Sequence, residues 1–460
     1  MKNYQAILDD VCDYKEFLTV EEMDASTLQL QKDYPELVEV SIAGYSRANH
    51  PIYCLKIGSG EKKALLFGCP HPNEPIGAMM LEYFSRALCE HQDYLRESSY
   101  TWYIIKCIDI DGTKFNEGWF KGPFNITNYA RNFFRPTSYE QVEWTFPIHY
   151  KEYSFENPMP ETKALMKLMD EIKPDFMYSL HNAGFGGAYW YLSDDIPELY
   201  PQFYHAAQGR GVPLSLGEAE APFIQQYAPA VFKNEGLEAE YDYLEKFSED
   251  KTKVASRFEC GTSSDGYASR YGTHSLLTEL PYFYSPKIES DIPMSWTRKE
   301  VKMKSAAMEK EEYLSIKKEY EAYQSMVSDD NPFTKMIEMM VKDRDETYQE
   351  TLNFVNDNES YLQICKESEY FDCMDVSRVY RLLMWGMLVR GAKFERAKRM
   401  DDTVHVWDSI IERLETIFAE KAEAVEQISY SVVPIQTLVR IQLESGLLMA
   451  SYIEKKGEEL

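Results

Sequence analysis

Two polar loops that follow apolar runs carry the residues best suited to chemistry. In GCPHPNEPIG, residues 68–77, His71 and Glu74 come just after the apolar run KKALLF, and Pro75 opens a segment with helical spacing. In PDFMYSLHN, residues 174–182, His181 follows a second apolar run. Ligands collect at the carboxyl ends of strands in open α/β sheets, so both histidines stand where a site is expected.

Together these three side chains match the ligand set that zinc uses in catalytic sites. Zinc binds neutral imidazole and ionised carboxylate, and a helix N-terminus keeps a carboxylate such as Glu74 ionised. His71, Glu74 and His181 would give a His₂Glu site with its fourth position left to water. The alternative is a turn that contains a histidine by chance, because isolated His-x-x-Glu pairs are common.

A third stretch, NYARNFFRP at residues 128–136, places Arg131 and Arg135 among aromatic residues. A guanidinium there could hold a carboxylate through two parallel hydrogen bonds, which lysine does less well. The simpler interpretation is a surface arginine stacked on a neighbouring phenylalanine.

A carboxylate also interrupts the apolar run LLTEL, residues 276–280, at Glu279. An ionised carboxylate in a buried strand is costly unless it is paired or faces a cleft. Beside a zinc-activated water it would serve as a general base. The alternative is a strand with one solvated face.

In this order, the pieces resemble the carboxypeptidase A-like zinc metallocarboxypeptidases. The resemblance covers about residues 15–285, and the lead-in YPELVEVSIAGYSRANHPIYCLKIG is also similar. The motifs that carry it are His71-x-x-Glu74, Arg131-Asn132-Phe133, His181 in SLHN and Glu279 in LLTEL.

The resemblance implies a role for each matching residue. His71, Glu74 and His181 would hold one zinc ion per chain, and Glu279 would be the general base. Arg131, with Asn132, would bind the terminal carboxylate of a peptide substrate. A tyrosine of DGYASRYG, Tyr267 in preference to Tyr271, would fold over the bound substrate.

Three departures from the family pattern keep several functions open. The tyrosine is not in the usual register, and HPNEP is richer in proline than the common form. Ala130 stands where the family has an asparagine. The family also has an arginine that stabilises the oxyanion, and here Lys121 is the one candidate to replace it. The first hypothesis is a zinc carboxypeptidase that cleaves the C-terminal peptide bond. The second is a related zinc deacylase or amidohydrolase acting on N-acyl amino acids or cell-wall peptides. The third is a non-catalytic relative that binds a peptide, which the presence of all four metal-site side chains disfavours.

The pattern of apolar residues predicts the scaffold that must position these groups. Strands alternate with helices over about 280 residues, which predicts a mixed, mostly parallel sheet with helices on both faces. The Gly-Ser-Gly at residues 58–60, between two apolar runs, predicts a hairpin. From about residue 300, few glycines and 3.6-residue patterning predict helices. We therefore expect a catalytic domain at 1–299 and an all-α region at 300–460, which could cap the cleft or form a homo-oligomer.

Composition limits the partners and the compartment. The 460 residues carry a formal net charge of −27, which disfavours binding to nucleic acid and to anionic membranes. No apolar run reaches the length of a membrane span, and the opening MKNYQAILDDVCDYKEF lacks the apolar core of a secretory signal. Eight cysteines without paired spacing are typical of reduced thiols. These features predict a cytoplasmic protein.

Overall fold

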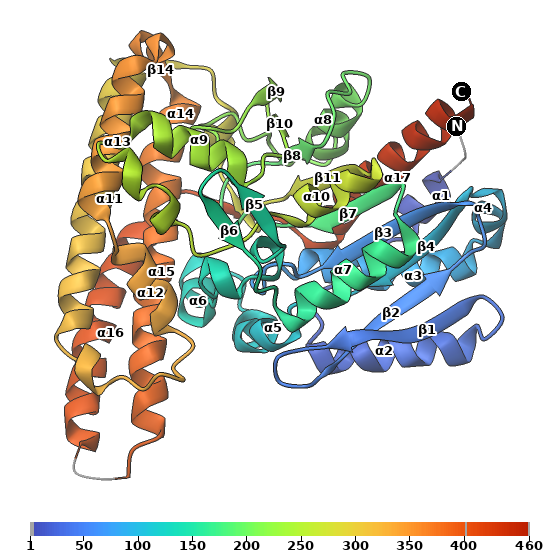
Figure 1. Cartoon of the computed structure of the whole chain (residues 1–460), viewed down its shortest axis with the longest axis horizontal. Helices are drawn as coiled ribbons and strands as arrows, with labels where there is room; N and C mark the ends of the chain where they lie inside the picture. Colours follow the sequence, from blue (N-terminus) through green and yellow to red (C-terminus); the bar gives the residue numbers. More distant parts are fainter. Residues whose placement is uncertain (1–3, 401–402, 459–460) are drawn as a thin grey trace.

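A nine-stranded mixed sheet forms the centre of the molecule (Figure 1). In the computed structural model, which describes residues 4–400 and 403–458, the strand order is β1-β2-β4-β3-β7-β11-β8-β10-β9. The strands are β1 (Val38–Tyr45), β2 (Pro51–Ile57), β3 (Lys62–Gly68), β4 (Tyr100–Ile105), β7 (Phe176–Leu180), β8 (Tyr189–Leu192), β9 (Gln226–Ala228), β10 (Val231–Lys233) and β11 (His274–Glu279).

The central strands of this sheet are parallel, as the sequence predicts. Strands β4, β3, β7 and β11 run in one direction, whereas β1, β2 and β8 join them through antiparallel pairs. Both faces are covered. Ala64 and Leu66 of β3 pack into one core, and Leu65 and Phe67 pack into the other. This two-sided burial explains the continuous apolar run, because a parallel strand between helices has no solvated face.

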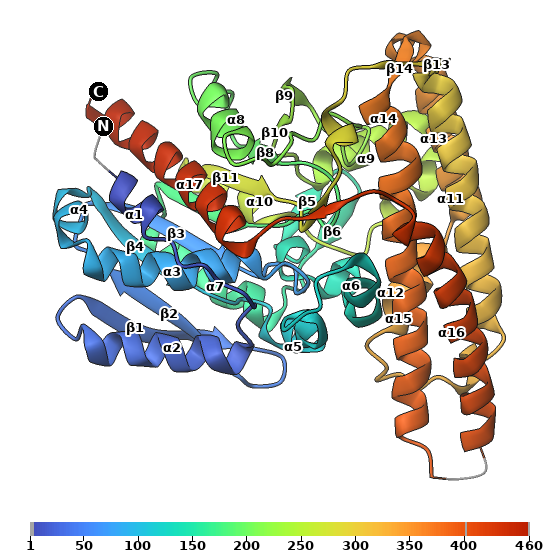
Figure 2. The ribbon, with the colours of Figure 1, turned by 180° about the vertical axis from the view of Figure 1, so that it is seen from behind.

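Helices cover the two faces of the sheet unequally. One face carries α3 (Ile76–Glu90), α8 (Tyr200–Gln208) and α17 (Ile435–Glu458), and Figure 2 shows α3 and α17 in front of the strands. The other face carries α7 (Pro160–Ile172) and α10 (Ser264–Ala268). The remaining helices before residue 290 are α1 (Gln5–Asp9), α2 (Val20–Asp33), α4 (Gln92–Glu97), α5 (Ile110–Asn116), α6 (Ile126–Asn132) and α9 (Leu237–Phe247).

The hairpin expected at residues 58–60 is wrong. Strand β4 lies between β2 and β3, pairing antiparallel with β2 and parallel with β3. The Gly-Ser-Gly instead carries the chain across the end of β4. Gly58 has a φ of 91°, a backbone conformation that favours glycine, and a Cβ on Gly60 would lie 2.1 Å from the carbonyl oxygen of Ser99.

The helical part differs from the expected 300–460 region. Its helices are α11 (Arg298–Glu321), α12 (Thr334–Val341), α13 (Arg344–Asp357), α14 (Glu367–Phe371), α15 (Ser377–Ala397) and α16 (Val404–Glu426). They form an insertion that stands beside α5 and α6 (Figure 1). The last helix, α17, leaves the bundle and packs on β7 and β11. Its amphipathic pattern could not reveal this, because the pattern is the same whichever surface the apolar stripe meets. Of the ranges 1–299 and 300–460, residues 1–3, 401–402 and 459–460 lie outside the described residues.

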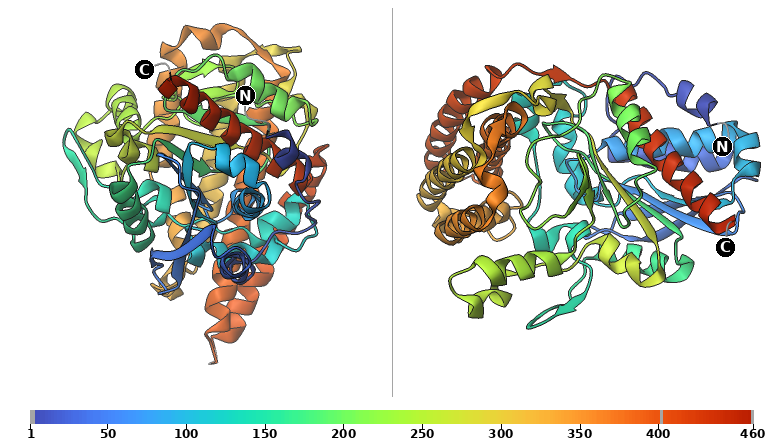
Figure 3. Two further views of the ribbon diagram at one scale, coloured as in Figure 1. Left: turned by 90° about the vertical axis from the view of Figure 1, so that its right-hand side faces the viewer. Right: turned by 90° about the horizontal axis from the view of Figure 1, so that it is seen from above.

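Close contacts fix α17 against the sheet and the insertion against α6. Gly446 of α17 lies against Tyr178 of β7, where a Cβ would come within 2.7 Å of the ring. The Tyr178 hydroxyl donates a hydrogen bond to the Gln442 carbonyl at 2.9 Å. Helix α15 approaches α6 closely at Gly386, where a Cβ would lie 2.0 Å from the Ala130 carbonyl oxygen. Figure 3 shows the insertion at one end of the molecule, with α1 and α17 near the other.

Three two-stranded ribbons accompany the central sheet. They pair β5 (Ile148–Tyr150) with β6 (Tyr153–Phe155), β12 (Phe283–Tyr284) with β15 (Ser431–Val432), and β13 (Pro293–Thr297) with β14 (Ile364–Lys366). A π-helical turn, Asp372–Val376, joins α14 to α15. No helix in the described ranges is both long and apolar enough to cross a membrane.

Candidate metal centre and active site

Three neighbouring parallel strands bring the predicted groups to one edge of the sheet. His71 lies in the loop after β3, His181 directly follows β7, and Glu279 is the last residue of β11. Because β3, β7 and β11 are adjacent and parallel, their carboxyl ends meet. Glu74 joins them from the same loop as His71, one residue before the cap of α3.

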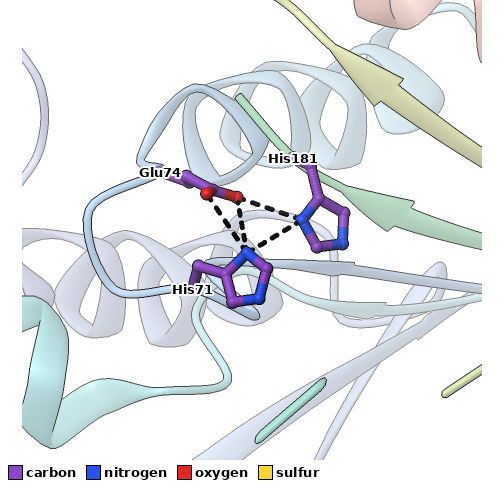
Figure 4. Close-up of side chains that lie close together, drawn as sticks. All are labelled: His71, Glu74 and His181. Atoms are coloured by element: carbon purple, nitrogen blue, oxygen red, sulfur yellow. Dashed lines mark hydrogen bonds and ion pairs between the residues drawn. The ribbon is translucent and has the colours of Figure 1, made fainter. Parts of the chain in front are cut away.

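Ligand atoms of His71, Glu74 and His181 converge on one point (Figure 4). The Nδ1 atoms of the two histidines are 3.1 Å apart. A Glu74 carboxylate oxygen lies 3.1 Å from Nδ1 of His71 and 3.0 Å from Nδ1 of His181. All three side chains are buried.

This cluster fits a tetrahedral metal better than it fits hydrogen bonds among its own members. Nε2 of His181 lies 2.8 Å from Ser179 Oγ, so that partner can hold the proton on Nε2 and leave a lone pair on Nδ1. Two zinc ligands at about 2.0–2.1 Å in tetrahedral geometry are roughly 3.3 Å apart, close to the separations found here. The residues present therefore fit the His₂Glu zinc site that the sequence predicts.

The electrostatic setting keeps the ligands in their metal-binding forms. Burial lowers the pKa of His71 to about 3, and the charge of Arg135 acts in the same direction, so this imidazole is neutral at pH 7. Burial alone would raise the pKa of Glu74, but the two imidazoles outweigh it and hold that pKa below its ordinary value. Asn182 N–H and Arg135 also donate to the Glu74 carboxylate, at 3.3 and 3.1 Å.

Glu279 stands beside the cluster without belonging to it. Its Oε1 lies 3.8 Å from Nδ1 of His181, and only 8% of the residue is exposed. Burial raises the pKa of Glu279 well above its ordinary value, and the carboxylates of Glu74 and Glu220 act in the same direction. A cation held by the cluster would lower this pKa again. A carboxyl group placed this way can exchange protons with a group bound next to the metal.

Two supporting residues escaped the sequence analysis. Glu143 accepts from Ser264 and from the Ser179 hydroxyl, and its Oε2 lies 3.9 Å from Nε2 of His181. Gln442 of α17 donates to the His181 carbonyl at 2.9 Å. Such partners orient metal ligands. Both come from segments distant in sequence with no motif of their own, so no local signal could have revealed them.

The arginine at the cluster is Arg135, four residues after the one that the resemblance selects. Arg135 contacts Glu74 and also donates from Nε to Gln141 at 3.2 Å. Arg131 lies in α6 and faces the insertion, with Nη1 2.6 Å from Glu415. Asn132 bonds Asn128 within the same helix. Both arginines can be recognised in the sequence, but which of them reaches the cluster depends on contacts with Glu74 and Glu415, which are distant in sequence.

Lys121 and the two expected tyrosines also lie elsewhere. Lys121 bonds the Phe17 carbonyl and Glu22, near the start of α2. Tyr267 and Tyr271 both donate to Asp170 of α7, on the opposite face of the sheet from α17. The structure therefore does not bring these three residues to the metal cluster.

A cavity of about 330 Å³ adjoins the cluster and separates the sheet from the insertion. Its near wall includes Ala183, two residues after His181, and Tyr189, the strand partner of Glu279. The insertion contributes Lys302 and Tyr380 to the far wall. The hydroxyl of Tyr380, from α15, accepts from Gly184 N–H at 3.3 Å.

Comparison with known proteins agrees with this geometry. The sequence model of the zinc carboxypeptidase family matches residues 23–207. This range contains His71, Glu74 and His181 and ends before Glu279, and it confirms the resemblance read from the sequence. No curated protein matches the chain.

Several solved structures are similar over a little more than half of this chain. Bovine thrombin-activatable fibrinolysis inhibitor shares 14% identity, over 57% of this chain and 86% of its own, with a TM-score of 0.37. Carboxypeptidase A from Helicoverpa armigera shares 15% sequence identity, over 58% of this chain and 65% of its own, with a TM-score of 0.36. Murein-tripeptide amidase from Escherichia coli O157 shares 16% sequence identity, over 58% of this chain and 89% of its own, with a TM-score of 0.28.

We expect the cluster to bind one divalent transition metal per chain. His181→Ala removes one of three ligands and should weaken metal binding at least about 100-fold. Competition with a chromophoric chelator measures this affinity, and elemental analysis measures the stoichiometry. His205→Ala, an exposed histidine on α8, is the matched control and should bind metal like the wild type. Equal affinity in the two variants would show that the cluster is not the site.

Proposed function

We propose that this protein, whose residues 23–207 match the zinc carboxypeptidase family, is a zinc-dependent hydrolase that removes the C-terminal residue of a peptide. One observation carries the proposal. Three buried zinc-type ligands converge at the carboxyl ends of adjacent strands, and the Glu279 carboxyl group lies 3.8 Å from one of them. This combination of a His₂Glu set and a nearby carboxyl base suits hydrolysis of an amide bond.

Each residue of the site has a defined task in this reaction. Bound zinc would supply Lewis acidity and lower the pKa of an attacking water. Glu279 would take a proton from that water and later pass it to the leaving amine, which restores its starting state. Arg135 would stabilise the negative charge that develops on the carbonyl oxygen of the substrate. Glu143 and Gln442 would position His181. Glu143 acts through the Ser179 hydroxyl, and Gln442 acts through the backbone carbonyl of His181.

The cavity next to the cluster offers one group for the free carboxylate of a peptide. Lys302 is the only cation among its lining residues, and in the described part of the chain no carboxylate lies within ion-pair distance of it. Burial would lower the pKa of Lys302, but nearby acidic groups, first Cys373 and then Glu218, raise it above its ordinary value. The amine therefore stays charged at neutral pH. We assign the carboxylate of the substrate to Lys302.

A second candidate, an amidase or deacylase, draws support from the position of Arg131. The expected carboxylate clamp is paired with Glu415 outside the cavity, and Lys302 cannot form the two parallel hydrogen bonds of a guanidinium. The cavity is also lined by several carboxylates, among them Glu218, Glu220 and Asp372. A substrate without a free C-terminal carboxylate would fit these walls as well.

The general-base role can be tested by Glu279→Gln. We expect this variant to keep its metal, because Glu279 is not a ligand, and to lose about 10²- to 10⁴-fold in kcat. Peptide hydrolysis is measured alongside metal content. Glu198→Gln, at an exposed position, should keep both. A rate within twofold of the wild type in Glu279→Gln would assign the proton transfer to another group.

The proposed oxyanion role of Arg135, in place of Lys121, can be tested by Arg135→Met. Arg135→Met should lower kcat by about 10²- to 10³-fold, since one charged donor to the developing oxyanion is lost. Metal content is measured in parallel, because Arg135 also contacts Glu74. Arg96→Met, an exposed arginine bonded to Asp93, serves as the control. Unchanged turnover in fully metallated Arg135→Met would remove this assignment.

Substrate preference separates the two candidate functions. We expect N-blocked dipeptides with a free C-terminus to show at least about tenfold higher kcat/KM than their C-terminal amides, because the amide cannot pair with Lys302. Lys302→Met should abolish this difference. Equal rates on acid and amide, together with activity on N-acyl amino acids, would favour the deacylase. Peptide binding without any hydrolysis would favour a non-catalytic relative.

A further inference from the structure

A second cavity, at the junction of α6 with the inserted helices, has no part in the proposed reaction. It encloses about 500 Å³ and is lined by Arg131 of α6 and by Arg390 and Lys393 of α15. Four phenylalanines complete its walls: Phe115, Phe333, Phe394 and Phe418. From this composition we infer that the cavity binds a small organic anion with a flat apolar body.

The charge of this cavity is opposite to that of the protein. Among the residues that the structure describes, no carboxylate lines it, although the chain carries a net charge of −27. One carboxylate lies beside it, Glu415 of α16, which is 2.6 Å from Arg131 and 2.6 Å from Lys393. Within residues 4–400 and 403–458, Glu415 is the one carboxylate at ion-pair distance from any of the three cations. A recess lined by charges of one sign focuses the electric field and raises the local concentration of ions of the opposite sign, here anions.

In the described part of the chain, Arg390 is the member of this set without a carboxylate partner. Its guanidinium donates to the carbonyls of Asn132, Phe133 and Phe115, at 2.6, 2.8 and 2.7 Å. Burial lowers the pKa of Arg390 to about 10, so the group is still charged at pH 7. A guanidinium has five N–H donors, and three hydrogen bonds leave two of them for a ligand.

The apolar walls indicate the shape of the rest of the ligand. Arg131 lies over the ring of Phe418 and Arg390 over the ring of Phe333, each at 4.5 Å from the centroid. A flat ring could lie against these stacked planes while its anionic group meets the nitrogen donors. An aromatic carboxylate or an aryl phosphate has both properties, and the two share the same chemistry of recognition.

The position of the cavity connects it to the metal centre through the backbone. Arg390 holds the carbonyls of Asn132 and Phe133, and Arg135 follows two residues later, in contact with Glu74. Any ligand that draws Arg390 toward itself acts on the segment that places Arg135. The anion site itself does not depend on the proposed reaction, and binding can be measured without it.

Isothermal titration of the protein with phenyl phosphate and benzoate tests the inference. We expect saturable binding of both anions and none of benzyl alcohol, the neutral analogue. Lys393→Met should weaken binding at least about tenfold, because it removes one charged donor. Glu415→Gln should strengthen binding several-fold, because it frees Arg131 and Lys393 from their competing carboxylate. A gain of affinity cannot come from a folding defect.

Lys317→Met is the control for loss of charge on the insertion. Lys317 is 44% exposed on α11 and Lys393 is 53% exposed on α15, and each has a glutamate neighbour. The control should bind phenyl phosphate like the wild type. Binding that is insensitive to both Lys393→Met and Glu415→Gln would place the anion elsewhere and overturn the inference. So would benzyl alcohol binding as tightly as phenyl phosphate, or no saturable heat up to 10 mM anion.

Discussion

Three electron-pair donors held about 3 Å apart inside the protein are the constraint on which the rest of the structure depends. Two imidazole nitrogens and a carboxylate cannot share one buried space cheaply without a cation between them. Three adjacent strand ends set their positions, and Ser179, Asn182 and Gln442 restrain them further. The fold supplies this convergence through strand order, which no single segment of the chain encodes.

The sequence was most informative at the ends of strands that carry residues able to bind metal or exchange protons. His71 and His181 could be recognised because each follows an apolar run whose direction and burial are readable. Glu279 could be recognised because a carboxylate is out of place in such a run. Alternation of strands and helices also predicted the parallel centre of the sheet, which β3, β7 and β11 confirm. These features are local patterns with long-range consequences that general rules supply.

What the sequence could not supply are contacts between distant segments. Arg131 lies in α6 and pairs with Glu415 of the insertion, whereas Arg135 follows that helix and contacts Glu74. Both partners are distant in sequence, so the local pattern could not tell the two arginines apart. The Gly-Ser-Gly at residues 58–60 is compatible with a hairpin or a crossover, and β4 decides between them. Likewise, the apolar stripe of α17 would suit packing on either the sheet or the helical bundle, so the sequence does not identify its partner.

Because α17 packs on the sheet, it also determines when the core of the sheet can finish folding during synthesis. While a ribosome is still making the chain, one face of β7 and β11 and the carbonyl of His181 lack the helix that covers them. The metal ligands emerge early, yet the brace behind His181 emerges last, after the whole bundle of α11–α16. Nascent chains must therefore keep an unfinished apolar face from aggregating during that interval, and a chain cut before residue 435 would keep it uncovered permanently.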